Sequence, residues 1–180
     1  SIGLQYLYTN LGPVAGLLFG GTYSLIVITG MHHSFHAVET GLLANPAIGV
    51  NFLLPIWSMA NVAQGGAALA VYCKTRNKTL KTVAAPASFS CLLGITEAAI
   101  FGVNLKLVRP FIGALIGGAL GGFTVVLAGV GMSGIGVTGI PGLALVAPQS
   151  MVMYIIGMAV AFAGAFAATW IMGFKEETGA

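Results

Sequence analysis

Charge is what this sequence lacks most. Only 6% of its 180 residues are charged, none is aspartate, and 57% are hydrophobic, whereas a soluble domain is roughly 25% charged and about 45–50% apolar. Residues 40–73 and 110–174 contain no Lys, Arg, Asp or Glu, and one spanning helix needs only about 20 apolar residues. The composition therefore argues against a soluble domain. It predicts an all-α integral membrane protein, a polytopic helical bundle.

Cysteine is scarce as well. Cys73 and Cys91 are the only two, and their spacing fits neither a metal site nor a redox pair. We therefore expect free thiols, no metal site and no other cofactor. The first ten residues also lack the basic stretch that opens a signal peptide. The sequence does not begin with Met, as expected of a fragment of a longer chain.

The few charges gather mainly in one short segment. Lys74, Arg76, Lys78 and Lys81 follow a long apolar run, and basic residues beside membrane spans usually mark the cytoplasmic side. We therefore interpret the net charge of +3 as a marker of orientation in the lipid bilayer. No binding to nucleic acid is expected.

Four apolar runs predict membrane spans, at residues 11–30, 48–72, 110–131 and 150–172. Pro55 lies inside the second run and predicts a kink there. Residues 134–148 are rich in Gly and Pro and predict an external loop. Gly113, Gly117 and Gly121 recur every four residues in the third run, a pattern that lets helices approach closely.

Residues 82–105 do not fit a simple span. A single crossing would place Lys106 and Arg109 outside, against the positive-inside tendency. A re-entrant hairpin removes the conflict: the chain would enter from Pro86, turn near residues 94–97 and return by Lys106. Irregular backbone at membrane depth is tolerated where protein or a cavity surrounds it, and many transporters build their sites from such broken helices. We therefore expect the tip of this hairpin to lie at a binding site.

Glu97, at that tip, is the first site candidate. An ionisable side chain at membrane depth costs about 2.5–3.5 kcal/mol or more, so its presence needs a reason. Gly94 would allow the turn, and a carboxylate can accept hydrogen bonds from two neighbouring hydroxyls of a sugar. The sequence therefore predicts a sugar site at Gly94, Thr96 and Glu97. The alternative is a structural glutamate paired with Lys106 or Arg109.

A second candidate cluster contains His32, His33, His36 and Glu39. On a helix His32 and His36 share a face, and Glu39 lies three residues beyond His36. An imidazole can both donate and accept, so one ring can serve two sugar hydroxyls. Two histidines and a glutamate could also bind a metal, and a histidine could simply cap a helix end. We expect hydrogen bonding to a sugar or within the protein rather than metal binding.

A third candidate group, Trp57, Asn61 and Gln64, shares one face of the second span, with spacings of four and three residues. An aromatic ring with two amides can stack on a sugar ring and hydrogen-bond its hydroxyls. Amides inside a membrane bundle also hydrogen-bond between helices. The sequence alone favours neither interpretation.

Several segments resemble one protein family. Residues 94–105 resemble the Gly-Ile-Thr-Glu motif of membrane component IIC (EIIC) of the bacterial phosphoenolpyruvate-dependent sugar phosphotransferase system, and residues 28–39 resemble its paired-histidine segment. Residues 60–66 and 136–142 are similar to further segments of that family. The resemblance spans essentially the whole chain and is strongest to sucrose permeases of the glucose superfamily, which share Ala98 where many relatives have Pro. Trehalose and β-glucoside permeases are the nearest alternatives.

The resemblance implies that residues 1–180 are the C-terminal, substrate-binding half of EIIC. The N-terminal scaffold half, through which the protein would form a homodimer, and the EIIB domain would lie outside this chain. The family's glutamate maps to Glu97 and its paired histidines to His32 and His33, which would hold a disaccharide. A phosphocysteine of EIIB, recharged by upstream phosphocarrier proteins, would phosphorylate the 6-hydroxyl, with Glu97 orienting that hydroxyl or taking its proton. The implied location is the bacterial cytoplasmic membrane, crossed several times.

Two other functions stay open. Glu97 could be the proton site of a proton-coupled secondary sugar transporter, or the chain could be an inert fragment in which these residues only pack. Uptake that needs a proton gradient and no phosphoryl donor would favour the first of these over group translocation.

Overall fold

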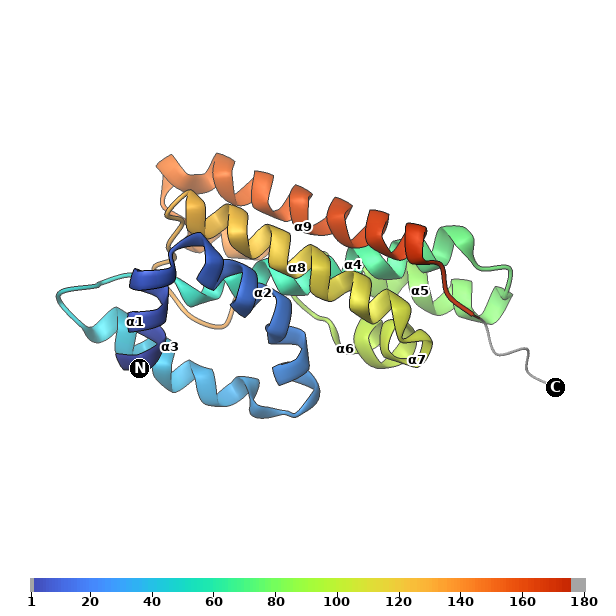
Figure 1. Cartoon of the computed structure of the whole chain (residues 1–180), viewed down its shortest axis with the longest axis horizontal. Helices are drawn as coiled ribbons and strands as arrows, with labels where there is room; N and C mark the ends of the chain where they lie inside the picture. The colour runs from blue at the N-terminus through green and yellow to red at the C-terminus, as the bar shows by residue number, and fades with distance from the viewer. Residues whose placement is uncertain (1, 176–180) are drawn as a thin grey trace.

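The structure, a computed structural model, describes residues 2–175 as a helical chain (Figure 1). Four long helices form its body: α2 (Pro13–Ile28), α4 (Leu53–Lys74), α8 (Arg109–Leu127) and α9 (Met151–Met172). Helix α4 is the central one, because every residue from 53 to 68 is buried. Helix α8 packs against α2, α4 and α9. Extended pairing within residues 2–175 is limited to two isolated bridges, which confirms the predicted all-helical class.

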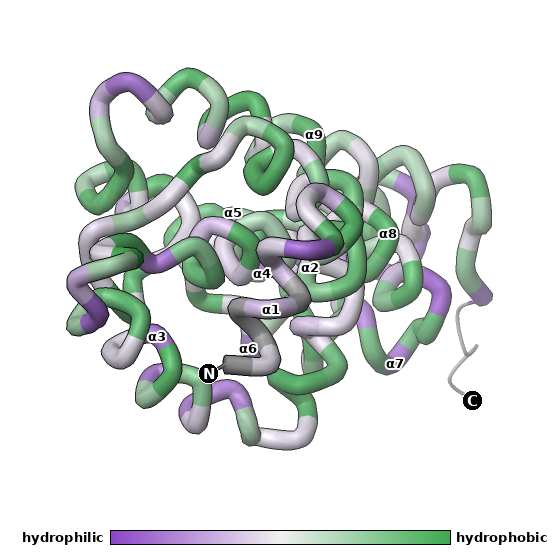
Figure 2. Tube along the Cα trace, turned by 60° about the vertical axis from the view of Figure 1, so that its left-hand side comes forward, coloured by the Kyte–Doolittle hydropathy of each residue, from purple (hydrophilic) through white to green (hydrophobic). Residues whose placement is uncertain are grey.

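Within residues 2–175, two helices are long and apolar enough to cross a membrane. They are Arg109–Leu127 and Pro148–Met172, and the second span includes the short 3-10 helix η4 (Pro148–Ser150) before α9. Green, apolar positions dominate α8 and α9 in Figure 2. Helix α4 has 22 residues, but Asn61 and Gln64 make it more polar. The predicted spans at residues 110–131 and 150–172 thus correspond to α8 and α9. The predicted span at residues 48–72 corresponds to α4, which is long enough but is not among the helices apolar enough to cross.

Glycine brings the bundle helices into backbone contact. Gly16 and Gly20 of α2 face Gly122 and Gly118 of α8 so closely that a Cβ on Gly20 would lie 2.9 Å from the Gly118 carbonyl carbon. On another side of α8, a Cβ on Gly117 would lie 2.6 Å from the Ala165 backbone nitrogen of α9. The close packing predicted from the glycine spacing is confirmed.

The predicted kink at Pro55 is wrong. Helix α4 starts at Leu53 and runs unbroken, so Pro55 lies in its first turn, where a backbone N–H has no acceptor within the helix. Asn51 caps this start, since its Oδ1 accepts hydrogen bonds from the backbone nitrogens of Leu53 and Leu54, both at 3.1 Å. The proline therefore begins the helix instead of bending it.

The first predicted span, residues 11–30, ends earlier than expected. The chain leaves α1 (Ile2–Leu11), runs through α2 and reverses at Gly30, which has a φ of 76°. A 3-10 turn η1 (Met31–Ser34) and α3 (Phe35–Ala44) follow, and α2 and the η1–α3 segment are bent by 120° to each other. The histidine segment therefore lies beside the bundle instead of extending the span (Figure 1).

The predicted hairpin is present, with a longer entering arm. Helix α5 (Lys78–Leu92) enters, and α6 (Glu97–Ala99), the π-helical turn η2 (Ile100–Asn104) and α7 (Leu105–Leu107) return. The two arms pack together through a cluster that includes Ala84, Cys91 and Val103. Pro86 lies inside α5, not at its entry. The turn-back near Glu97, which the charge distribution predicted, is confirmed.

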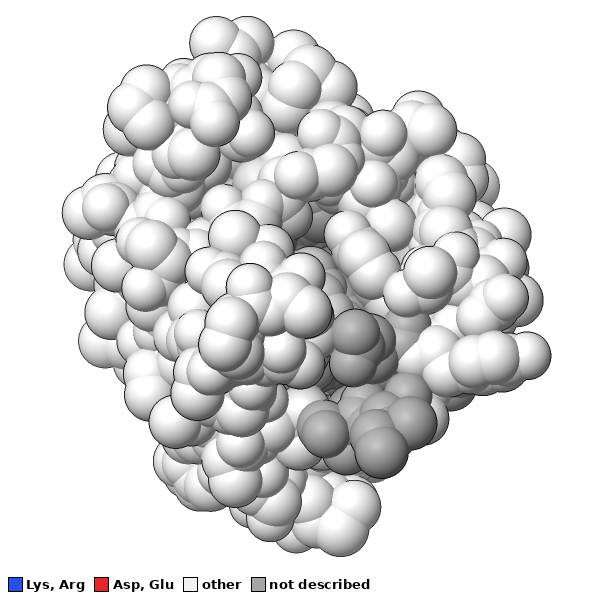
Figure 3. Space-filling view, turned by 90° about the vertical axis from the view of Figure 1, so that its left-hand side faces the viewer, with Lys and Arg blue, Asp and Glu red and all other residues white. Residues whose placement is uncertain are grey.

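Basic residues gather at one end of the bundle. Lys74 Nζ donates to the Trp170 carbonyl at 2.7 Å, and Arg109 Nη1 donates to the Met172 carbonyl at 2.9 Å. Lys106 and Lys175 line one hollow at the same end. The opposite face shows no charged side chain among its described residues (Figure 3). The prediction that all Lys and Arg lie on one side is confirmed.

The loop after α8 is more than an external connection. Thr138 and Gly139 are buried, and the backbone N–H of Gly139 donates to Ser58 Oγ of α4 at 2.7 Å. The chain then forms the 3-10 turn η3 (Ile140–Leu145) before α9. The prediction of a wholly external loop is therefore wrong, because this segment inserts between α4 and the tip of the α5–α6 hairpin.

Candidate sugar-binding cavity

A cavity of about 160 Å³ lies where the hairpin tip, α4, the second half of α2 and the histidine segment meet. Most of its lining is polar or aromatic. The lining residues are Tyr23, Val27, His32, His33, His36, Glu39, Leu54, Trp57, Asn61, Gly94, Thr96, Glu97, Gly136 and Thr138. Seven of the eight site residues predicted from the sequence are therefore brought together; Gln64 is the exception.

Glu97 is exposed and lines this cavity. It makes no ion pair with any residue in the described range 2–175. The two alternative partners lie elsewhere: Arg109 binds the Met172 carbonyl, and Lys106 lines the hollow at the basic end. The interpretation of Glu97 as half of a structural ion pair is therefore wrong, and its carboxylate is available to a ligand.

The position of the hairpin tip is fixed by contacts with the loop that follows α8 and with α4. Gly94 has a φ of 86°, and a Cβ there would lie 2.5 Å from Thr138 Oγ1, so the position needs glycine on two counts. Thr138 Oγ1 in turn accepts a hydrogen bond from Asn61 Nδ2 at 3.0 Å. Asn61 therefore positions the tip through Thr138 while it also lines the cavity. Thr96, 4% exposed, completes the tip beside Glu97.

The three histidines form one cluster of rings. The ring centroids of His32 and His33 are 4.0 Å apart, and those of His33 and His36 are 5.8 Å apart. His36 Nδ1 donates to Glu39 Oε2 at 3.2 Å, so the spacing of three residues makes the contact that it predicted. No group of three or more His, Cys, Asp or Glu within residues 2–175 has a metal-binding arrangement.

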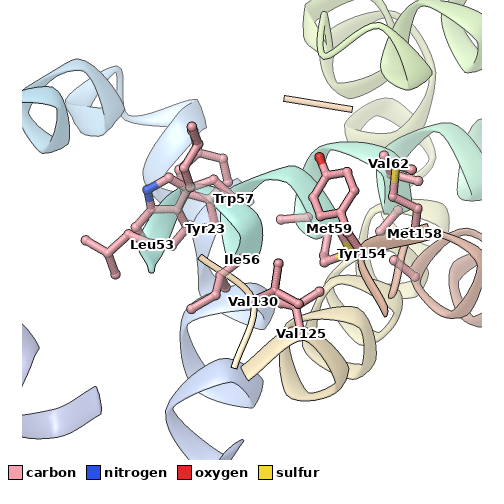
Figure 4. Close-up of a cluster of buried hydrophobic side chains, with 14 of the residues drawn as sticks. Tyr23, Leu53, Ile56, Trp57, Met59, Val62, Val125, Val130, Tyr154 and Met158 are labelled. Atoms are coloured by element: carbon pink, nitrogen blue, oxygen red, sulfur yellow. The ribbon is translucent and has the colours of Figure 1, made fainter. Parts of the chain in front are cut away.

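Trp57 is buried in an aromatic stack. Its ring stacks on that of Tyr23 (Figure 4), with 4.4 Å between the ring centroids. The Phe35 ring meets it edge-on, with the centroids 5.5 Å apart. Only 2% of Trp57 is exposed, so no ring face is open for a sugar to stack on, and that part of the prediction is wrong. Its indole Nε1 is buried without a hydrogen-bond partner. Trp57 therefore contributes the N–H edge of its indole to the cavity lining instead of a ring face.

Gln64 does not line the cavity and lies about one helical turn beyond Asn61 on α4. Its Nε2 donates to Ser24 Oγ of α2 at 2.9 Å, and its Oε1 accepts from Asn104 Nδ2 of η2 at 2.8 Å. These bonds tie α2, α4 and the returning arm of the hairpin together. Of the two interpretations open from the sequence, hydrogen bonding between helices describes Gln64.

Tyr23, Thr138 and Gly136 also line the cavity and were not predicted as site residues, whereas Glu39 was predicted only as a member of the histidine cluster. Glu39 had a visible signal, since the spacing already paired it with His36. Thr138 and Gly136 lie in residues 136–142, a segment that was noted for its resemblance and was predicted to belong to an external loop. Tyr23 had no local signal, because a tyrosine in an apolar run is equally at home in a core.

Comparison with known proteins identifies the family of the chain. The family described as "Phosphotransferase system, EIIC" matches residues 1–118. The chain is 59% identical to the sucrose-specific EIIBC component of Salmonella typhimurium over 177 residues, which cover 98% of this chain and 39% of that protein. It is 56% identical to a Bacillus subtilis sucrose-specific EIIBC component (98% and 39%) and 40% identical to the β-glucoside-specific EIIBCA component of that organism (98% and 29%). The chain thus spans about two fifths of the length of its sucrose-specific relatives. No solved structure matches it significantly.

Proposed function

Because this chain belongs to the phosphotransferase-system EIIC family, we propose that it binds a sugar in the cavity at Glu97 and presents it for phosphorylation. The observation that carries the proposal is the Glu97 carboxylate, which lines a largely polar cavity at the tip of the hairpin and makes no ion pair within residues 2–175. An unpaired carboxylate in such a place is explained by a ligand that donates hydrogen bonds.

Sucrose is the substrate that we propose. The relatives at 56–59% identity are named sucrose-specific, and the relative named β-glucoside-specific is 40% identical. The cavity suits a polyol, since hydroxyl, imidazole, amide and carboxylate groups line it. Trehalose and β-glucosides are the competing substrates to test.

In the proposed mechanism Glu97 accepts hydrogen bonds from the 6-hydroxyl and a neighbouring hydroxyl, while His32 and His33 bind the sugar from the other side. Glu97 orients the 6-hydroxyl towards the phosphoryl donor or takes its proton as a general base. The donor is a phosphocysteine of EIIB, a domain present by name in the relatives. It would approach from the basic end of the bundle, which is the cytoplasmic side by the positive-inside tendency.

The remaining predicted partners belong to the complete protein. Upstream phosphocarrier proteins would recharge EIIB, and a second copy would bind through the scaffold half outside this chain. We propose the bacterial cytoplasmic membrane as the location, with α8 and α9 crossing it.

The test is Glu97→Gln in the full-length permease that contains this chain, with sucrose binding and EIIB-dependent phosphorylation both measured. Loss of a hydrogen bond to a charged group costs about 1.5–3 kcal/mol, so binding should weaken roughly 10- to 100-fold. Lys106→Gln is the matched control, because it removes a charge from the same hairpin outside the cavity; sucrose binding should not change.

Wild-type binding and phosphorylation in the Glu97→Gln variant would contradict the assignment of Glu97. Sucrose uptake that collapses with the proton gradient and persists without a phosphoryl donor would instead favour a proton-coupled transporter.

A further inference from the structure

The cavity contains a second carboxylate that the proposed mechanism does not use. Glu39 of α3 is 1% exposed and lines the cavity on the histidine segment, away from the hairpin tip that carries Glu97. Two of the four glutamates of the chain therefore face one small cavity from different elements.

Glu39 is only partly satisfied by the protein. One hydrogen bond of good geometry reaches it within residues 2–175, from His36 Nδ1 to Oε2, and the Asn51 and Trp57 side chains lie beside it as further donors. An ionised carboxylate has two oxygens and about four acceptor positions. A buried charge with unused acceptor capacity is costly unless another donor supplies the missing hydrogen bonds. A donor is therefore expected on the cavity side.

Trp57 supplies the complementary half of the site. Its indole Nε1 is buried and unpartnered, and it lies beside the Glu39 carboxylate without meeting the geometry of a hydrogen bond. The stacking on Tyr23 and the edge contact with Phe35 hold the indole ring in place. An N–H donor and a carboxylate acceptor side by side match a hydroxyl group, which accepts from the first and donates to the second.

Building on the proposed function, we propose that Glu39 and Trp57 form a second hydroxyl-binding site, which holds the ring of the disaccharide that is not phosphorylated. One ring would lie at Glu97 and the other at Glu39 and Trp57, with the histidine rings between the two carboxylates. His36 then acts as a positioning residue, because its hydrogen bond orients the Glu39 carboxylate. The two sites together would favour a disaccharide over a single sugar ring.

The experiment compares sucrose with methyl α-D-glucopyranoside, a one-ring probe, in the full-length permease. Glu39→Gln should weaken sucrose binding roughly tenfold or more and change binding of the one-ring probe less than about twofold. Trp57→Phe keeps an aromatic ring against Tyr23 and deletes the N–H, so it should move the same ratio in the same direction. Glu97→Gln should weaken both sugars by similar factors.

A structural role for Glu39 predicts a different pattern, in which the melting temperature falls and both sugars bind more weakly. That pattern, or an unchanged ratio of the two affinities in both Glu39→Gln and Trp57→Phe, would overturn the second site. Trp170 remains as an intrinsic fluorophore in Trp57→Phe, so folding of that variant can be checked directly. If the wild-type protein binds neither sugar, the proposed function itself fails, which is a separate result.

Discussion

The crossing of α2 and α8 gives a sharp prediction for stability. In Gly20→Ala the new Cβ would overlap the carbonyl oxygen of Gly118 and lie 2.9 Å from its carbonyl carbon and 3.3 Å from Gly122 Cα. All three are backbone atoms, so no rotamer change can relieve the contact and the helices must separate. A gap of about 0.5–1 Å already forfeits a quarter to a half of each dispersion contact at the interface.

We expect a net loss of about 1–2 kcal/mol in the free energy of unfolding for Gly20→Ala. Overpacking of this kind costs about 1–3 kcal/mol, while alanine recovers up to ~1 kcal/mol of helix propensity. The assay is thermal unfolding of the full-length protein in detergent, followed by the loss of its monodisperse gel-filtration peak. The melting temperature should fall by several degrees.

Gly41→Ala is the matched control for this prediction. Gly41 also lies inside a helix, α3, but an added Cβ would meet nothing within 4 Å. The same substitution should therefore stabilise slightly, by about 0.5–1 kcal/mol. Opposite signs for the two variants test the backbone contact itself; an equal, small effect at both positions would refute close approach of α2 and α8.

Two further predictions concern the start of α4 and the orientation of the chain. Asn51→Ala removes the cap of α4 and the hydrogen bond from Asn51 Nδ2 to the Gly134 carbonyl at 3.1 Å, so the free energy of unfolding should fall by about 2 kcal/mol. The control Asn45→Ala, at a partly exposed turn, should cost under about 1 kcal/mol. Equal losses in the two variants would count against the cap. A membrane-impermeant maleimide should label Cys73, which is exposed at the basic end, but not buried Cys91, when added to inside-out vesicles of a variant without other cysteines. Labelling of Cys73 in intact cells would reverse the assigned orientation.

Composition and charge placement predicted the architecture well. Long uncharged runs predicted helical spans, and the positions of Lys106 and Arg109 predicted a hairpin with Glu97 at its tip. These signals are readable because the bilayer imposes length and charge rules on any sequence that crosses it. The hydrogen bond between His36 and Glu39 was also predictable, because their spacing of three residues in a helix is enough to bring the two side chains together.

The errors share a physical cause: contacts between residues far apart in the sequence cannot be predicted from local sequence patterns. Pro55 is harmless or disruptive depending on where the helix starts, and the Asn51 cap sets that start. Gln64 shares a helix face with Asn61 but binds Ser24, a partner 40 residues away in the sequence. Tyr23 reaches the cavity only because α2 packs beside α4.

The glycine contacts between α2 and α8 also constrain how the cavity can change shape. Main chain rests on main chain at Gly16, Gly20, Gly118 and Gly122, so no layer of adjustable side chains separates the two helices. Tyr23, one turn beyond Gly20, is therefore part of a rigid wall. Widening or narrowing of the cavity to admit and release a guest must come from the other elements that line it, which are α4, the histidine segment and the hairpin tip.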